Sequence, residues 1–223
     1  MKKNNSIKFP KIVKVGSLQY TVVFPYVFVD QPTYVGLHNG PTAIIRIADT
    51  YQESKRGNQV LLETYMHELL HAIDFVYGCD SVDEDTIAVF ARAWLQVLQD
   101  NNLFLYTQQV PKRVKVGCFT YKVNYPYSSV ENSKTTIATT SNSRLDINID
   151  HDDGAENFSL KFIKVVLLHG IMSAISCTYF NNDADEGEIN SMTHMKKTSM
   201  SNGLYQVLTD NKVDMLIDKY KSR

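Results

Sequence analysis

The sequence is poor in the features that mark several whole classes of protein. Among its 223 residues are only three cysteines, Cys79, Cys118 and Cys177, and they lie far apart. Three such cysteines make neither a Cys-x-x-Cys site nor a disulfide framework, so we expect a reducing compartment. No apolar run approaches the roughly 18 residues of a membrane span. Lysines at positions 8, 11 and 14 interrupt any signal-peptide core.

An excess of charge of either sign is also missing. The chain has 23 basic and 24 acidic side chains, which gives a formal net charge of -1. A near-neutral chain has no bulk attraction to nucleic acid or to an anionic membrane. With 43% hydrophobic residues it has the composition of a globular protein. We therefore expect a cytoplasmic protein with neither a nucleic-acid nor a membrane partner.

The chain contains an internal repeat of domain size. Residues 9–28 and 110–129 are identical at ten of twenty positions, and residues 94–101 resemble residues 204–211. A period near 100 residues is too long for a solenoid repeat. The sequence therefore predicts two tandem domains, residues 1–109 and 110–223.

The first half alternates between strand and helix signals. Two β-rich runs flank Gly16 and predict a hairpin, a third strand follows, and two apolar-periodic segments predict helices. The expected elements are Lys11–Val15, Gln19–Phe24, Thr42–Ala48, a helix from Asn58 to Tyr77, and a helix from Ser81 or Asp83. This order predicts an α+β fold in which a small antiparallel sheet, a hairpin plus a strand, packs on two helices.

The second half repeats this order. Its expected elements are Val114–Val123, Leu145–Ile149, a helix over Ser159–Tyr179, a helix ending near Leu208, and a short last helix, Val213–Tyr220. The polar stretch Asn181–Asn190 predicts a loop between the two longer helices.

One motif in the first predicted helix carries chemistry. His67 and His71 lie four residues apart, so both imidazoles project from one helical face. That spacing lets both rings bind one Zn²⁺ at about 2.0–2.1 Å. Glu68 is rotated by about 100° around the helix from His67, so it does not join the two histidines as a ligand. It suits a general base that acts on a water molecule activated by the metal.

A catalytic zinc site needs a third protein ligand. Acidic residues at the start of the second predicted helix are the candidates, and helical phase turns Glu84 and Asp83 inward but Asp85 toward water. Glu84 is the first choice and Asp83 the second. Asp74 lies on the histidine face, and we expect it to accept a histidine N–H and fix the ring tautomer.

Other parts of the site are less well defined by the sequence. The strand Thr42–Ala48 is a candidate sheet edge to which an extended peptide could add. Candidates for oxyanion stabilisation are His38, Tyr34, Tyr51 and Arg92.

The second half lacks the motif. Aligning Leu61–Ile73 with Ser159–Ile171 places Val165 and Val166 at the positions of the first histidine and the glutamate, and leaves only His169, opposite His71. His169 with His194 or His151 could still bind a metal, although nothing in the sequence fixes their geometry. The second copy is expected to serve packing or binding.

The first half resembles the short, gluzincin-like zincin metallopeptidases. The resemblance rests on His67–Asp74 (HELLHAID), on the preceding Ala43–Asp49 and on the following Asp83–Asn101, and covers about residues 10–101. The segment is similar to small bacteriophage-encoded proteins assigned as metallopeptidases, and more loosely to mobile-element peptidases that cleave phage-type repressors.

The resemblance implies zinc bound by His67, His71 and Glu84, Glu68 as the base, and a peptide or protein substrate. It also implies two zincin-like domains, and residence in a host cytoplasm or a virion. The alternative is a non-enzymatic phage or mobile-element protein, a virion component or a host-factor binder, that retains the fold with structural or vestigial zinc.

Overall fold

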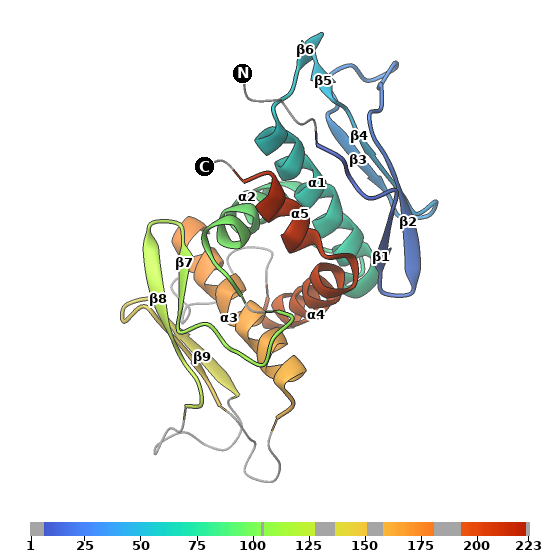
Figure 1. Ribbon diagram of the computed structural model, residues 1–223. Coiled ribbons are helices and arrows are strands. Elements are labelled where there is room, and N and C mark those ends of the chain that lie inside the picture. The colour runs from blue at the N-terminus through green and yellow to red at the C-terminus, as the bar shows by residue number, and fades with distance from the viewer. Residues whose placement is uncertain (1–6, 104, 128–136, 151–157, 181–192, 222–223) are drawn as a thin grey trace.

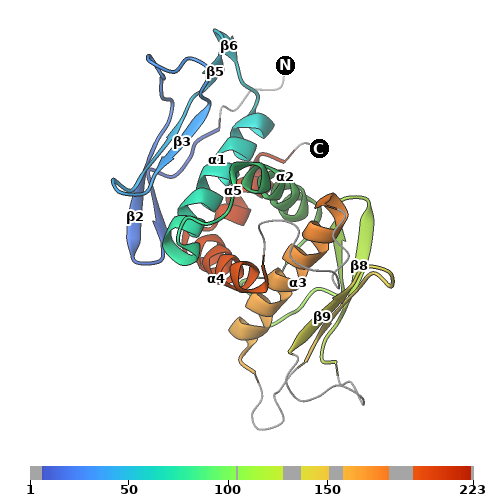
Figure 2. The same ribbon diagram turned by 180° about the vertical axis from the view of Figure 1, so that it is seen from behind.

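The chain forms two outer sheets with helices between them (Figure 1), seen in a computed structural model. The structure describes residues 7–103, 105–127, 137–150, 158–180 and 193–221. The view from behind shows the same order of sheet, helices and sheet (Figure 2). The predicted α+β class is confirmed.

The N-terminal half contains six strands and two long helices. The strands are β1 (Ile12–Val15), β2 (Leu18–Val23), β3 (Gly36–Asn39), β4 (Ile44–Ile47), β5 (Thr50–Tyr51) and β6 (Ser54–Lys55). Helix α1 (Asn58–Ile73) continues into a π-helical turn, η1 (Asp74–Gly78), and α2 spans Glu84–Asp100. Gly16 closes the β1–β2 hairpin at φ +57°, a backbone conformation that glycine adopts without strain.

The first sheet differs from the prediction in three ways. Its order is β1-β2-β4-β3, and β2 and β4 run parallel, so the prediction of a purely antiparallel sheet is wrong. Strand β3 was not predicted, because its residues GLHN carry no β-branched side chain. The sheet edge is therefore β3 rather than Thr42–Ala48. The long segment 24–43 between β2 and β4 provides the crossover that a parallel pair requires.

The C-terminal half repeats this arrangement. Strands β7 (Arg113–Val116), β8 (Phe119–Asn124), β9 (Ala138–Ser141) and β10 (Asp146–Ile149) form a sheet of order β7-β8-β10-β9, again with one parallel pair. Three helices follow, α3 (Leu160–Phe180), α4 (His194–Asn211) and α5 (Val213–Lys219). The loop predicted at Asn181–Asn190 lies outside the described residues.

The structure corrects the alignment of α1 with α3. A side chain at Gly16 would meet Tyr77, and one at the equivalent Gly117 would meet Tyr179, so the two tyrosines correspond. The buried positions of the two helices coincide at the same shift of 102 residues (179 − 77), for example Leu61 with Ile163 and Leu70 with Met172. His169 is therefore the counterpart of His67. The sequence alignment, which placed it opposite His71, was wrong. Gly170 stands at the position of Glu68, and Ser173 at that of His71.

The two halves are joined by reciprocal contacts. Helix α4 packs on β1 and η1 of the first half, and α2 packs on β7 of the second. The Gln206 side-chain carbonyl accepts from the Gly16 amide, as that of Gln96 does from Gly117, each at 2.8 Å. Asn211 and Asn101 accept in the same way from the amides of Lys14 and Lys115. The repeated 94–101 and 204–211 segments thus join the halves, which share one continuous hydrophobic core.

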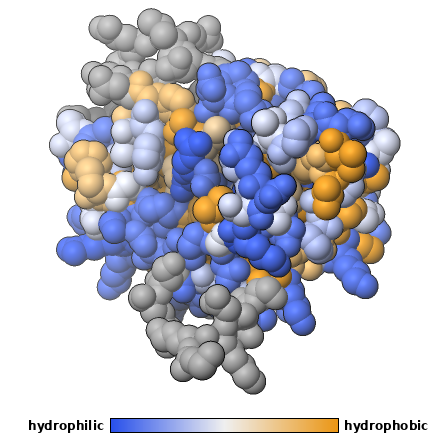
Figure 3. Space-filling view, turned by 90° about the horizontal axis from the view of Figure 1, so that it is seen from above, coloured by the Kyte–Doolittle hydropathy of each residue, from blue (hydrophilic) through white to orange (hydrophobic). Residues whose placement is uncertain are grey.

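Helix α3 is long and apolar enough, by length and composition, to cross a membrane. However, 56% of its most apolar window is buried inside the protein, as in the core helix of a globular fold. The surface in Figure 3 is mostly hydrophilic, with apolar groups in separate clusters.

Candidate metal centre

Helix α1 brings the two histidines of the motif together. His67 and His71 lie one helical turn apart, and their Nε2 atoms are 3.1 Å from each other. Both side chains are 19% exposed, so the rings are partly shielded but open on one side. Burial lowers the pKa of His67, and the neighbouring His71 lowers it further, while Glu84 acts in the opposite direction.

Glu84 completes the cluster from the first residue of α2. Its Oε1 lies 3.0 Å from Nε2 of His67, and its Oε2 lies 2.9 Å from Nε2 of His71. One ligand atom from each residue falls within a group in which all pairs are closer than 4.8 Å, so these three residues could hold a metal ion. The Glu84 side chain is 69% exposed. It therefore lies at the mouth of the site. The prediction from helical phase that Glu84 points inward is wrong.

Asp83 is occupied elsewhere. It is the N-cap of α2, and its carboxylate accepts from the backbone amide of Thr86 at 2.8 Å and from the Thr86 hydroxyl at 2.9 Å. This cap explains why helix α2 begins where it does and why the next residue, Glu84, faces the histidines. Asp83, the second choice as a metal ligand, thus helps to position Glu84, the first choice.

Asp74 has a different role from the one predicted. It is fully buried, and its Oδ2 accepts from the backbone amide of Val82 at 2.7 Å. Its other oxygen has no hydrogen-bond partner among the described residues, so the expected hydrogen bond from a histidine is not seen there. Asp74 therefore fixes the turn that leads from η1 into α2, and through that turn it fixes the position of Glu84.

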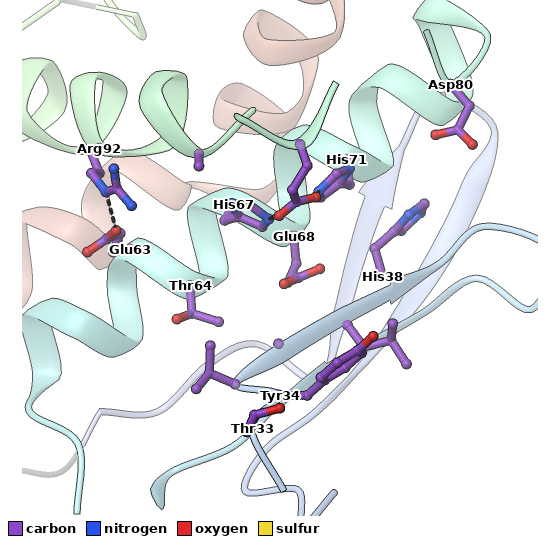
Figure 4. A pocket seen from close by; sticks show the side chains of 15 residues that line it. Thr33, Tyr34, His38, Glu63, Thr64, His67, Glu68, His71, Asp80 and Arg92 are labelled. Carbon is purple, nitrogen blue, oxygen red and sulfur yellow. Dashed lines mark hydrogen bonds and ion pairs between the residues drawn. The ribbon is translucent and has the colours of Figure 1, made fainter. Parts of the chain in front are cut away.

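Glu68 lies beside the histidines on the side that faces strand β3. It is only 5% exposed. Burial raises the pKa of Glu68 to about 8, the charge of Glu84 adds to this rise, and the nearby backbone of His38 opposes it. Figure 4 shows Glu68 pointing into the cavity below His67 and His71.

Gly36, which was not among the predicted site residues, makes room for Glu68. A Cβ at this position would lie 2.2 Å from Glu68 Oε1 and 2.6 Å from the Thr64 methyl group. The strand can approach the carboxylate closely only because this residue has no side chain. In the second half Ala138 stands at the position of Gly36, and Gly170 stands at the position of Glu68. The glycine of this pair therefore lies on the helix there instead of on the strand.

The cluster opens into a cavity of about 740 Å³ between β3, α1 and the start of α2 (Figure 4). Its lining comprises Thr33, Tyr34, Val35, Gly36, Leu37, His38, Glu63, Thr64, His67, Glu68, His71, Asp80, Glu84, Ala88 and Arg92. Three of the four oxyanion candidates, Tyr34, His38 and Arg92, are among these residues, and Tyr51 is not.

Two of these candidates have partners already. Arg92 is paired with Glu63 at 2.8 Å, and Nε2 of His38 lies 3.2 Å from the Tyr20 hydroxyl. Burial, followed by the charge of His71, lowers the pKa of His38 to about 4, so its ring is neutral.

The second half contains a matching cleft with different chemistry. A cavity of about 460 Å³ is lined in large part by counterparts of residues in the first cavity, with His169 at the position of His67. His194, the first residue of α4, stands where Glu84 begins α2. Burial lowers the pKa of His169 to about 4, with contributions from His194 and then Lys197. This cleft has no counterpart of Glu68, because Gly170 stands there.

Comparisons of the chain with protein-family models, with curated proteins and with solved structures give no match. The functional reading therefore rests on the residues of this chain.

Proposed function

We propose that the protein is a zinc-dependent hydrolase of peptide bonds, with zinc held by His67, His71 and Glu84. The observation that carries the proposal is the carboxylate of Glu84, whose two oxygens lie 3.0 and 2.9 Å from the Nε2 atoms of His67 and His71, with Glu68 buried nearby. Two imidazoles and one carboxylate are a known ligand set of catalytic zinc, which keeps a fourth position open. When bound, the metal would polarise a carbonyl group and acidify a water molecule.

Glu68 is the proton carrier in this proposal. Its carboxylate takes a proton from the attacking water as the C–O bond forms, and gives it to the amine nitrogen as the C–N bond breaks. A carboxyl group with a pKa of about 8 is largely protonated at neutral pH and cannot accept a proton. A divalent cation held by His67, His71 and Glu84 would favour the ionised form of Glu68, so metal binding would also prepare the base.

Strand β3 supports a peptide as the substrate. It is the edge strand of its sheet, and its first residues line the same cavity as Glu68 and the histidines. An extended peptide that adds to this edge would be held by main-chain hydrogen bonds next to the metal ligands. This placement agrees with the resemblance of the first half to zincin metallopeptidases.

In the same proposal the chain consists of two tandem zincin-like domains, of which only the first is catalytic. Gly170 and Ser173 replace the base and one histidine in the second copy. This loss also supports the alternative, a non-enzymatic phage or mobile-element protein in which the first site binds zinc without catalysis. The following experiment separates the two.

The test combines zinc content with peptide cleavage. The zinc-loaded protein is incubated with a defined pool of acetylated peptides, and new termini are identified by mass spectrometry. We expect cleavage by the wild type, and a loss of about 10²–10⁴-fold in Glu68→Gln, the usual contribution of a general base. Zinc should be retained in Glu68→Gln and lost in His67→Ala. Glu53→Gln, an exposed change away from the site, is the matched control.

Two results would overturn the proposal. Equal cleavage by wild type and Glu68→Gln would remove Glu68 from the mechanism. A zinc-loaded wild type that generates no new termini would favour the non-enzymatic alternative.

A further inference from the structure

The second half has a cleft in the same place as the first cavity, with a smaller volume and a different lining. Its cavity of about 460 Å³ lies between the edge strand β9, α3 and the start of α4, as the first cavity lies between β3, α1 and α2. Its described lining is Ile137, Ala138, Phe162, Val165, Val166, His169, His194, Thr198, Ser201 and Asn202. Val165 and Val166 replace Glu63 and Thr64. The polar side chains of this lining are the two imidazoles and those of Thr198, Ser201 and Asn202.

These two imidazoles are arranged like the histidine pair of the first site. The ring centroids of His169 and His194 are 4.8 Å apart, with an interplanar angle of 69°. The corresponding values for His67 and His71 are 4.7 Å and 66°. The pairs are not equivalent in sequence, because His194 comes from α4 and occupies the position of Glu84. The second cleft thus reaches a similar ring geometry with a different pair of residues.

One ring nitrogen of His169 is available as a ligand atom. Its Nε2 is buried with no hydrogen-bond partner among the described residues. An imidazole nitrogen is a common ligand of transition-metal ions. A metal ion in the cleft would therefore satisfy a buried polar atom that the described residues leave unpaired.

We infer that the second cleft is a separate binding site for a divalent transition-metal ion, with His169 and His194 as its protein ligands. An imidazole pair suits Zn²⁺, Cu²⁺ and Ni²⁺ rather than Mg²⁺ or Ca²⁺. Two protein ligands leave the remaining positions to water or to a donor group of a molecule in the apolar cleft. The site contains no base equivalent to Glu68, so it binds without hydrolysing. This inference does not depend on the proposed activity of the first half.

The test removes the first site and counts the metal that remains. Full-length His67→Ala/His71→Ala protein is stripped with a chelator and dialysed against Zn²⁺ at several concentrations, and bound zinc is measured by mass spectrometry. We expect saturation at one Zn²⁺ per chain, and a fall to background when His194→Ala is added. Asn202→Ala, which changes a lining residue of the same cleft in the same background, should keep the ion. Circular dichroism confirms that each variant is folded.

A second measurement reports the ligand atoms. Cu²⁺ added to the His67→Ala/His71→Ala protein should give an electron paramagnetic resonance spectrum with couplings from two imidazole nitrogens, reduced to one in His194→Ala. The inference would be overturned if the His67→Ala/His71→Ala protein bound zinc no more strongly than the same protein with His194→Ala added. A copper spectrum unchanged by both His169→Gln and His194→Ala would also overturn it.

Discussion

Replacing the buried Glu68 by glutamine should change how the stability of the metal-free protein depends on pH. Burial raises the pKa of this carboxyl group from 4.5 to about 8 in the folded protein. At 1.36 kcal/mol per unit, ionised Glu68 would cost the metal-free fold up to about 5 kcal/mol. Glutamine has nearly the same shape and carries no charge, so Glu68→Gln should remove this cost.

The sign follows from proton binding. Below about pH 4.5 the glutamate is protonated in both the folded and the unfolded chain, so the wild type and the variant should be similarly stable. Between about pH 4.5 and 8 the folded state keeps a proton that the unfolded state releases, and the wild type loses stability as pH rises. The advantage of Glu68→Gln should therefore be small at pH 5 and reach its maximum above pH 8.

The assay is urea unfolding of chelator-treated protein at pH 5.0 and pH 8.5, followed by circular dichroism. The quantity of interest is the free energy of unfolding of Glu68→Gln minus that of the wild type at each pH. Exposed Glu53→Gln serves as the control. A difference that is the same at both pH values, or larger at pH 5.0, would refute the reasoning that burial raises the pKa of Glu68.

Two further changes test the supports of the site. Gly36→Ala places a methyl group against Glu68 and should lower the free energy of unfolding by about 1–3 kcal/mol. A melting temperature equal to that of the wild type would contradict the close approach of β3 to Glu68. Asp74→Ala leaves the buried Val82 amide without its acceptor and should lower the free energy of unfolding by about 1–3 kcal/mol. It should also weaken zinc binding, because the turn that holds Glu84 loses this hydrogen bond. Unchanged zinc affinity in a chelator competition would show that the turn does not position Glu84.

The histidine pair was predictable from the sequence because its geometry is local. Four residues in a helix fix the relation between His67 and His71, whatever the rest of the chain does. Glu84 was a choice among three acids, because its place depends on the turn between two helices. That turn is closed by the buried Asp74–Val82 hydrogen bond, which no local pattern reveals. Helical phase also predicted that Glu84 points inward, whereas the first residue of a helix lies at its exposed end.

Other parts of the fold escaped the sequence for physical reasons. Strand β3 has only Gly36, Leu37, His38 and Asn39, and it is a strand because β4 offers it hydrogen bonds. The alignment of α3 with α1 was wrong by four residues. Such a shift rotates a helix by only about 40°, so the apolar pattern fits almost equally well in both alignments. The distinction needed the contacts of Gly16 and Gly117 across the hairpins.

The central claim is that His67, His71 and Glu84 hold one metal ion. Crystals of the zinc-loaded protein, with anomalous diffraction recorded at the zinc absorption edge, test it most directly. We expect an anomalous peak about 2.0–2.2 Å from Nε2 of each histidine and from a carboxylate oxygen of Glu84. Saturating zinc that leaves no peak between these residues, or a peak bound to other side chains of the first cavity, would contradict the claim.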